Sequence, residues 1–214
     1  MGVQAGAGAR LTPLMASVLV VCTGNICRSP LAVGFLRAAL ASRLGSGAPS
    51  VYSVGTFGWS GSEAMPESVE AGAERGVDIS DHQARRLTAG DIRGADLVLG
   101  AAAEHCDAVV AEVPEAAGRT FTLKELVRLL EALPAAAGSG EPGDLLIRRV
   151  SEADSLRRSG FAGNSADEDV SDPMGLPHEA FRAIAWELEE WCLRLVEGLF
   201  GKTPAHAASG TEEG

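Results

Sequence analysis

The stretch that decides the fold reads Val20-Val21-Cys22-Thr23-Gly24-Asn25-Ile26-Cys27-Arg28-Ser29-Pro30. Its apolar, β-branched beginning is typical of a central parallel strand that is buried on both faces. Gly24 and Asn25 interrupt this strand, and Pro30 stands where the first turn of a helix is expected. Apolar residues then recur at helical spacing as far as Leu40. The stretch therefore predicts a strand, a tight loop and a helix.

The predicted loop, residues 22–29, has the chemistry of an oxyanion site that carries a nucleophile. Backbone N–H groups in such a turn form a concave nest, and the N-terminus of the following helix adds unpaired donors and a partial positive charge. The Arg28 guanidinium can bind two phosphoryl oxygens at once. The same field favours the ionised form of the Cys22 thiol, to which Ser29 can donate a hydrogen bond. The residues predicted to bind phosphate are Thr23, Gly24, Asn25, Ile26, Cys27, Arg28 and Ser29.

Each feature of this oxyanion loop is weak evidence when taken alone. A cysteine at a strand end is usually a small buried hydrophobe, and a Gly-Asn pair is usually a turn. The loop also lacks the Gly-Lys-Ser/Thr of a nucleotide-binding loop and the GxGxxG of a dinucleotide-binding fold. The prediction rests on the conjunction of strand, cysteine, arginine, serine, proline and helix in one short stretch.

Strands and helices alternate along the rest of the chain. Further strands are predicted at residues 51–54, 95–99 and 119–121, and helices at 66–74, after the third strand, from 122 onward, at 144–158 and at 181–199. This alternation predicts an α/β fold in three layers, with a parallel sheet, helices on both faces and a phosphate-binding loop after the first strand.

Composition excludes several classes of protein. The 214 residues include 29 acidic and 18 basic side chains, for a formal charge of −11, which argues against a nucleic-acid-binding surface. No apolar run is long enough for a membrane span, and the N-terminus does not read as a signal peptide. The four cysteines form no disulfide framework and the histidines show no metal-ligand spacing, so we expect a reducing, cytoplasmic location and no metal. We expect one domain over 17–200, a flexible tail over 1–16 and a polar tail over 201–214.

At these residues the sequence resembles the low-molecular-weight protein tyrosine phosphatases of bacteria. The signature of that family is similar to residues 21–30 almost residue by residue. Similar segments follow at 53–56, 76–79, 82–85, 95–99 and 172–175, whereas 134–166 looks like an insertion. The resemblance implies a four-stranded parallel sheet and hydrolysis without metal or organic cofactor.

The resemblance also implies roles for individual residues. Cys22 would attack phosphorus and form a cysteinyl-phosphate, Arg28 would hold the phosphoryl oxygens, and Asp172 would be the general acid. Trp59 stands where an aromatic wall of the substrate pocket is expected. Met174 replaces a residue that is often aromatic in the family, which makes that wall more flexible. Three nearby carboxylates lack a following proline and are more typical of a solvated loop: Asp167, Glu168 and Asp169.

Other residues with reactive side chains have alternative interpretations. Cys27 either forms a protective disulfide with Cys22 under peroxide or packs beneath the loop. Because adjacent helix residues do not share a face, His105 is expected at the surface and Cys106 in the core. Cys192 lies on the apolar stripe of the last helix and is expected in the core. The tryptophans of the same helix, Trp186 and Trp191, are expected to pack against the protein.

The sequence leaves three functions open. The first is hydrolysis of phosphotyrosine in proteins, with a bacterial tyrosine kinase as the counterpart. The second is reduction of arsenate with an external thiol, since Cys106 alone cannot complete an internal disulfide relay. The third is a non-catalytic phosphate-binding regulatory module.

Overall fold

The computed structural model describes residues 16–136, 140–161 and 168–202. Its centre is a four-stranded parallel sheet in the order β2-β1-β3-β4. The strands are β1 (Ser17–Cys22), β2 (Ser50–Gly55), β3 (Leu97–Gly100) and β4 (Thr120–Thr122). The predicted tails lie almost wholly outside the described residues, as do positions 162–167 of the predicted loop before Asp172.

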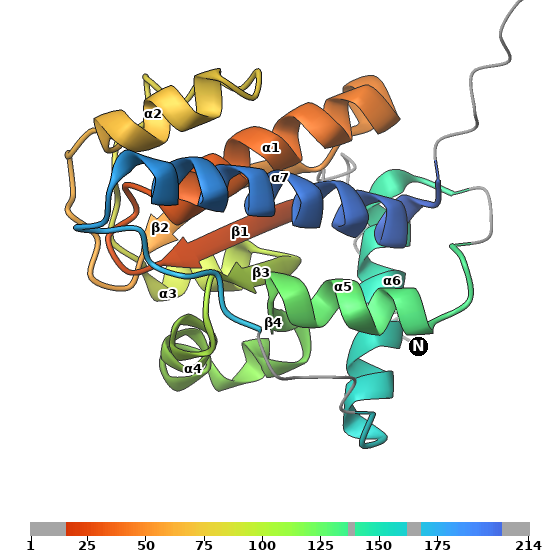
Figure 1. The fold of residues 1–214 in the computed structure, drawn as a ribbon. Coiled ribbons are helices and arrows are strands. Elements are labelled where there is room, and N and C mark those ends of the chain that lie inside the picture. The colour runs from red at the N-terminus through yellow and green to blue at the C-terminus, as the bar shows by residue number, and fades with distance from the viewer. Residues whose placement is uncertain (1–15, 137–139, 162–167, 203–214) are drawn as a thin grey trace, which may run out of the picture.

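Helices cover both faces of this sheet, as Figure 1 shows. One face carries α1 (Arg28–Leu44), α2 (Pro66–Ala73), α5 (Leu123–Ala132), α6 (Pro142–Arg158) and α7 (His178–Phe200). The other face carries α3 (Ala89–Gly94) and α4 (Ala103–Glu112). The short 3-10 turns are η1 (Gly45–Gly47) and η2 (Pro114–Arg119).

The central strand β1 contributes to both hydrophobic layers. Val18 and Val20 pack in the cluster that contains α1 and α7, whereas Leu19 and Val21 pack in the cluster that contains α3 and α4. Successive side chains of a strand point to opposite faces, so a wholly apolar strand suits a sheet covered on both sides. The predicted three-layer α/β fold is confirmed.

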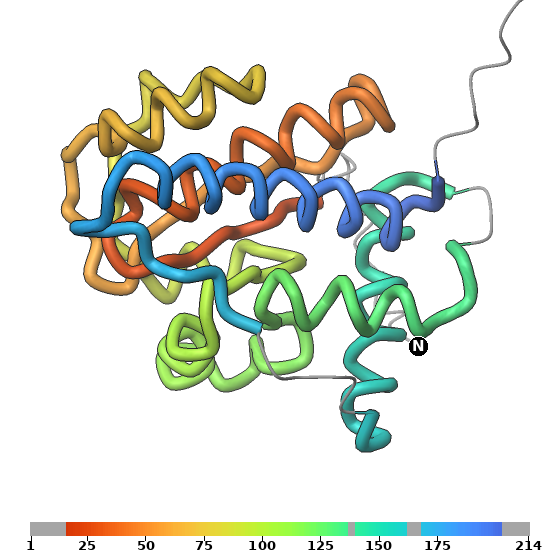
Figure 2. Tube along the Cα trace, viewed as in Figure 1, coloured from red at the N-terminus to blue at the C-terminus, as the bar shows by residue number. Residues whose placement is uncertain are grey.

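The chain changes direction across the sheet at the end of β1. From β1 the chain crosses to β2 on one side and later returns to β3 on the other. Ligands of open α/β sheets bind at such switch points, outside the carboxyl ends of the strands. The tube in Figure 2 shows residues 168–177, in light blue, running past this end of β1. We call residues 168–177 the Asp172 loop.

Helix α6 confirms the helix predicted at 144–158 and packs beside α5 and α7. Its buried Arg149 donates to the carbonyl oxygens of Leu130 and Gly198, near the C-terminal ends of those two helices. Because helix C-termini carry partial negative charge, one guanidinium stabilises both ends.

Two details of the helices differ from the sequence-based expectation. The sequence patterns do not predict α3, which is too short to show a period and is defined by a capping box between Thr88 and Asp91. Trp186 is 56% exposed, so the expectation that it packs is wrong. Trp191 is partly buried and lies under the Arg194 guanidinium, 4.0 Å from its carbon to the ring centroid. Within the described residues no helix is both long and apolar enough to cross a membrane.

Candidate active site

The carbonyl groups of the oxyanion loop point outward, into the surrounding protein. Each carbonyl oxygen from Cys22 to Cys27 accepts a hydrogen bond from a neighbouring segment or from α1. The donors, in order, are the amides of Thr56, Phe57 with Gly58, and Trp59, the His82 imidazole, and the amides of Met65 and Leu31. With its acceptors engaged outside, the loop turns its donors inward.

The amides of the oxyanion loop remain available to a ligand. In the described part of the chain, no protein acceptor faces the amides of Gly24, Ile26 or Cys27, and the Asn25 amide points at Cys22 Sγ, 3.3 Å away. Helix α1 begins at Arg28 without a side-chain cap and without an acidic residue in its first turn. Unpaired amides at an uncapped helix N-terminus form an anion-binding nest.

Asn25 holds the loop in this shape. It has φ of 59°, the left-handed conformation that asparagine tolerates better than most residues. Its buried side chain donates from Nδ2 to Ser29 Oγ and Ser53 Oγ, both at 2.9 Å, and accepts from the Arg85 amide at Oδ1. The strained turn is therefore fixed by three hydrogen bonds.

The candidate nucleophile, Cys22, is buried at the end of β1. Its Sγ lies 3.0 Å from Ser29 Oγ. Because Ser29 Oγ already accepts from Asn25 Nδ2, its own hydrogen is free to point at the sulfur. A hydroxyl donor of this kind stabilises sulfur as the thiolate, both before attack and as a leaving group.

Arg28 joins the oxyanion loop to the Asp172 loop. Its Nη2 lies 2.6 Å from Asp172 Oδ2 and 3.3 Å from Thr23 Oγ1, and its Nη1 donates to Val170 O at 3.1 Å. The guanidinium side chain is 5% exposed, whereas the Asp172 side chain is 48% exposed. The carboxylate of Asp172, the candidate acid, is therefore exposed at the mouth of the site, while the guanidinium that it contacts is buried.

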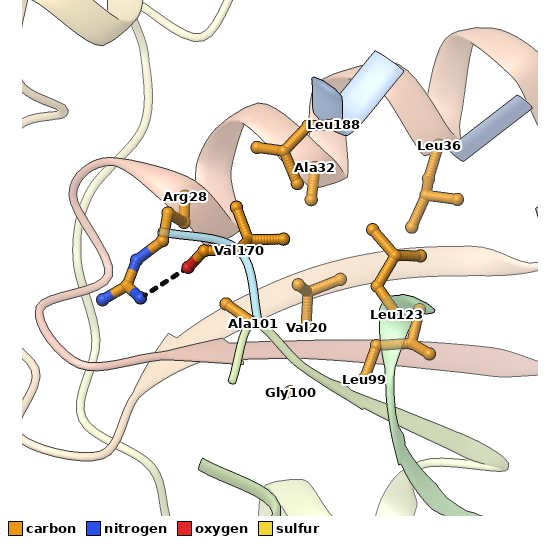
Figure 3. Close-up of a pocket in the computed structure, with 10 residues that line it drawn as sticks. All are labelled: Val20, Arg28, Ala32, Leu36, Leu99, Gly100, Ala101, Leu123, Val170 and Leu188. Atoms are coloured by element: carbon orange, nitrogen blue, oxygen red, sulfur yellow. Dashed lines mark hydrogen bonds between the residues drawn. The ribbon is translucent and has the colours of Figure 1, made fainter. Parts of the chain in front are cut away.

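A small apolar pocket lies behind Arg28, as Figure 3 shows. Arg28 lies at one end of this pocket, the side chains that line the rest of it are aliphatic, and the dashed line marks the bond from Arg28 to Val170 O. This environment keeps water from the back of the guanidinium and strengthens its charge interactions. The lining residues are Val20, Ala32, Leu36, Leu99, Gly100, Ala101, Leu123, Val170 and Leu188.

The Asp172 loop is anchored so that the other described carboxylates face away from the site. Asp169 Oδ1 accepts from the Ala103 amide at 2.8 Å, at the start of α4, and Glu168 pairs with Arg128. Lys124 Nζ donates to Asp169 O at 2.7 Å. These contacts leave Asp172 as the carboxylate beside Arg28, while Asp167 lies outside the described residues.

The mouth of the site is largely apolar. Ile26, Trp59 and Met174 line one pocket together with Cys22, Arg28 and Asp172. Sequence reasoning missed Phe57, which lines the same pocket and is 64% exposed. The sequence feature that could have indicated Phe57 is its position two residues before Trp59, in the same glycine-containing turn.

That turn lies close against the oxyanion loop because two glycines allow it. A Cβ at Gly55 would lie 2.5 Å from Thr23 O, and a Cβ at Gly58 would lie 2.5 Å from Arg86 Cα. Both contacts are shorter than any side chain tolerates, so the glycines permit the approach that brings Phe57 and Trp59 to the mouth.

His105 corrects an expectation about α4. It is 1% exposed and its Nε2 lies 3.0 Å from Thr23 Oγ1, whereas Cys106 is the more accessible of the two. The prediction of a surface histidine beside a core cysteine is wrong, because His105 lies in the first turn of α4 and turns back toward the Ala102 amide. The expectation that Cys192 is buried in the core is confirmed.

The arrangement of sheet, loop and thiol defines a class: phosphatases that act through a cysteine. A family model described as low molecular weight phosphotyrosine protein phosphatase matches residues 17–133. A probable low molecular weight protein-tyrosine-phosphatase, EpsP of Ralstonia solanacearum, is 40% identical over 113 residues, covering 53% of this chain and 74% of the relative. A protein-arginine-phosphatase of Geobacillus stearothermophilus is 32% identical over 182 residues, covering 85% of this chain and 95% of the relative.

A solved structure supports the same relationship. The low molecular weight protein tyrosine phosphatase from T. tengcongensis matches with a TM-score of 0.64 and 34% identity, over 86% of this chain and 99% of that one. This chain belongs to the low molecular weight protein tyrosine phosphatase family, and is a hydrolase of that family.

Proposed function

We propose that this protein hydrolyses phosphotyrosine in proteins through a cysteinyl-phosphate, with Cys22, Arg28 and Asp172 in the catalytic roles. One observation carries the proposal: an inward-facing amide nest, a buried thiol, an arginine and one carboxylate all border the same pocket. The phosphoryl dianion would occupy the nest and take Arg28 as a partner, which separates the guanidinium from Asp172.

In the first step the Cys22 thiolate attacks phosphorus and the bond to the tyrosine oxygen breaks. Arg28 and the loop amides stabilise the charge on the equatorial oxygens. Asp172 gives its proton to the departing phenolate. Its position at the mouth, beside Trp59 and Met174, puts the acid where the leaving group exits.

In the second step the Asp172 carboxylate takes a proton from water as the water attacks phosphorus. The S–P bond breaks, phosphate leaves and the thiolate is restored. The Ser29 hydroxyl, 3.0 Å from the sulfur, stabilises the departing thiolate. The groups that attack phosphorus, hold its oxygens and move the proton all border the pocket, and Ser29 supports the sulfur from behind.

The relationship to a protein-arginine-phosphatase makes phosphoarginine a second candidate substrate. The mouth of this site favours the aromatic ester. Ile26, Phe57, Trp59 and Met174 offer no polar partner to the N–H groups of a guanidinium, and Asp172 is needed as the acid. An unpaired buried polar group costs about 1–3 kcal/mol, whereas a phenyl ring gains from apolar walls.

Turnover of matched peptides tests this preference. We expect kcat/KM for a phosphotyrosine peptide to exceed that for the same peptide with phosphoarginine by about 10- to 100-fold, from the cost of the unpaired guanidinium. Trp59→Ala should lower kcat/KM for the phosphotyrosine peptide but not for the phosphoarginine peptide, and so bring the two values closer together. Equal turnover, or a preference for phosphoarginine, contradicts the proposal.

The site supports the two alternative functions less well than hydrolysis, although arsenate reduction with an external thiol would need only Cys22. An internal arsenate relay would need two further thiols on the segment after β3, where Cys106 of α4 lies against Gly100 and burial raises the pKa of that thiol to about 12. A purely regulatory phosphate-binding module would not need an acid at the mouth. Arsenate reduction with an external thiol, or tight phosphate binding without turnover, are the outcomes that favour these functions.

Cys27 is proposed to protect the nucleophile from over-oxidation. Peroxide oxidises the Cys22 thiolate to a sulfenic acid, and the Cys27 thiolate then attacks that sulfur, forming a disulfide and releasing water. Burial raises the pKa of Cys27 to about 12, so little thiolate is present near neutral pH.

We expect peroxide to inactivate the enzyme, thiol to restore it, and intact mass to show a Cys22–Cys27 bond. Because closure needs the Cys27 thiolate, disulfide formation should accelerate as the pH rises. In Cys27→Ala, Cys22 should proceed to sulfinic acid and activity should not return. Sulfinic acid formed equally in both proteins shows that Cys27 only packs beneath the loop.

The proposed substrates are phosphotyrosine proteins of the bacterial cytoplasm, with a tyrosine kinase as the counterpart. The support is the family relationship and a reactive thiol that functions only when it is kept reduced.

A further inference from the structure

The histidine of α4 has no role in the mechanism above, although it contacts the oxyanion loop. His105 is 1% exposed, and its two ring nitrogens have different partners. Nδ1 faces the Ala102 amide at 3.0 Å, and Nε2 faces Thr23 Oγ1 at 3.0 Å. The imidazole therefore links the start of α4 to the residue that follows the nucleophile.

The partners determine which nitrogen carries the proton. The Ala102 amide can only donate, so Nδ1 accepts and the proton of the neutral ring resides on Nε2. Nε2–H then donates to Thr23 Oγ1, which also accepts from Arg28 Nη2 at 3.3 Å. Both lone pairs of the Thr23 hydroxyl are filled, one by His105 and one by Arg28.

We propose that His105 is a positioning residue for the phosphatase reaction. Its Nε2–H fixes the orientation of the Thr23 hydroxyl, and that hydroxyl, by accepting from Arg28, limits rotation of the guanidinium. The proposal rests on the proposed function, because Arg28 must meet the equatorial oxygens of the transition state. A guanidinium that rotates loses the geometry of a bidentate fork. Without this contact, binding of the transition state should weaken more than binding of the ground state.

The surroundings keep the ring neutral. Burial lowers the pKa of His105 first, and the nearby Arg28 charge lowers it further. The negative charges of Glu104 on α4 and Asp169 on the Asp172 loop act in the opposite direction. The net pKa lies below the usual 6.5, so the tautomer described above persists near neutral pH.

Two substitutions separate this role from the support that His105 gives to α4. In His105→Asn, the side-chain oxygen can accept from the Ala102 amide, but the shorter side chain does not reach Thr23. In His105→Gln, the side-chain nitrogen can reach Thr23 and donate, while the bond to Ala102 is lost. The first variant keeps the helix contact and the second keeps the contact with the loop.

We expect His105→Asn to lower kcat by about three- to tenfold, the range for one neutral hydrogen bond, with little change in KM. His105→Gln should recover most of the loss, even though it unfolds at a lower temperature. Inhibition by vanadate, which mimics the five-coordinate transition state, should weaken in His105→Asn more than inhibition by phosphate. Thr23→Val should cause a similar loss, and the two changes together should cost no more than either one.

Exposed His178→Asn is the matched control and should leave kcat unchanged. Full activity in His105→Asn overturns the proposal, and so does a loss of activity that follows thermal stability in both His105 variants. Additive losses in the double variant also overturn it. Failure of the proposed function is a separate outcome, because the unmodified enzyme would then not turn over phosphotyrosine at all.

Discussion

Cys22→Ser should abolish hydrolysis of phosphotyrosine while the protein continues to bind phosphate. The serine oxygen is a far weaker nucleophile, since a free hydroxyl is almost wholly protonated near neutral pH whereas a thiol ionises far more readily. The inward-facing amides and Arg28 are untouched by the change. The measurement pairs turnover of a phosphotyrosine peptide with calorimetric titration of inorganic phosphate.

Cys106→Ser is the matched control, because that thiol lies outside the pocket and should not affect turnover. A second control is mass analysis of the active enzyme quenched in acid, which should trap phosphate on Cys22. Turnover above background in Cys22→Ser, or a trapped phosphate elsewhere, shows that another group attacks phosphorus.

The fold could be predicted because its local and long-range signals agree. The apolar run of β1 specifies a central strand, and the alternation of strands with helices specifies parallel pairing. Thr122 accepts from the Glu125 amide and caps α5, where the sequence predicts a helix from 122 onward. The sequence did not predict α3, because six residues are too few to show a helical period. It wrongly predicted that Trp186 packs, because an apolar side chain on the surface looks the same in the sequence as a buried one.

The oxyanion loop could be predicted because its residues are adjacent in the chain. Eight consecutive residues contain the side chains that carry its chemistry, so their spacing brings them together: Cys22, Asn25, Arg28 and Ser29. His105 follows Thr23 by many residues and meets it only through the pairing of β1 with β3. No local pattern contains that contact, which is why the surface assignment of His105 was wrong.

Asp172 is an intermediate case between the adjacent residues of the oxyanion loop, which the sequence predicts, and His105, which it does not. It is distant in sequence from Arg28, and only the family resemblance assigned it as the acid. The structure adds a physical reason: Met174 donates its amide to Asp172 Oδ1 at 3.1 Å, which fixes the carboxylate in a tight turn aimed at Arg28. This turn therefore orients the carboxylate that we propose as the acid.

Asp172→Ala should lower kcat by about 10²–10⁴, the scale for loss of a general acid or base. Asp172 gives its proton to the departing phenolate, so without that side chain the negative charge on the leaving oxygen is not neutralised. The loss should be largest for phenols that are weak acids, because a strongly acidic phenol departs without a proton.

Asp169→Ala is the matched control and separates the two carboxylates by their contacts. Asp169 bonds the Ala103 amide rather than Arg28, so its loss should weaken the start of α4 and lower thermal stability, while kcat and the slope against leaving-group acidity stay near those of the unmodified enzyme. The measurement is kcat for a series of aryl phosphates whose phenols differ in acidity, on all three proteins. If Asp169→Ala steepens the dependence on the leaving group and Asp172→Ala does not, the acid is Asp169, and the contact of Asp172 with Arg28 only holds the loop closed.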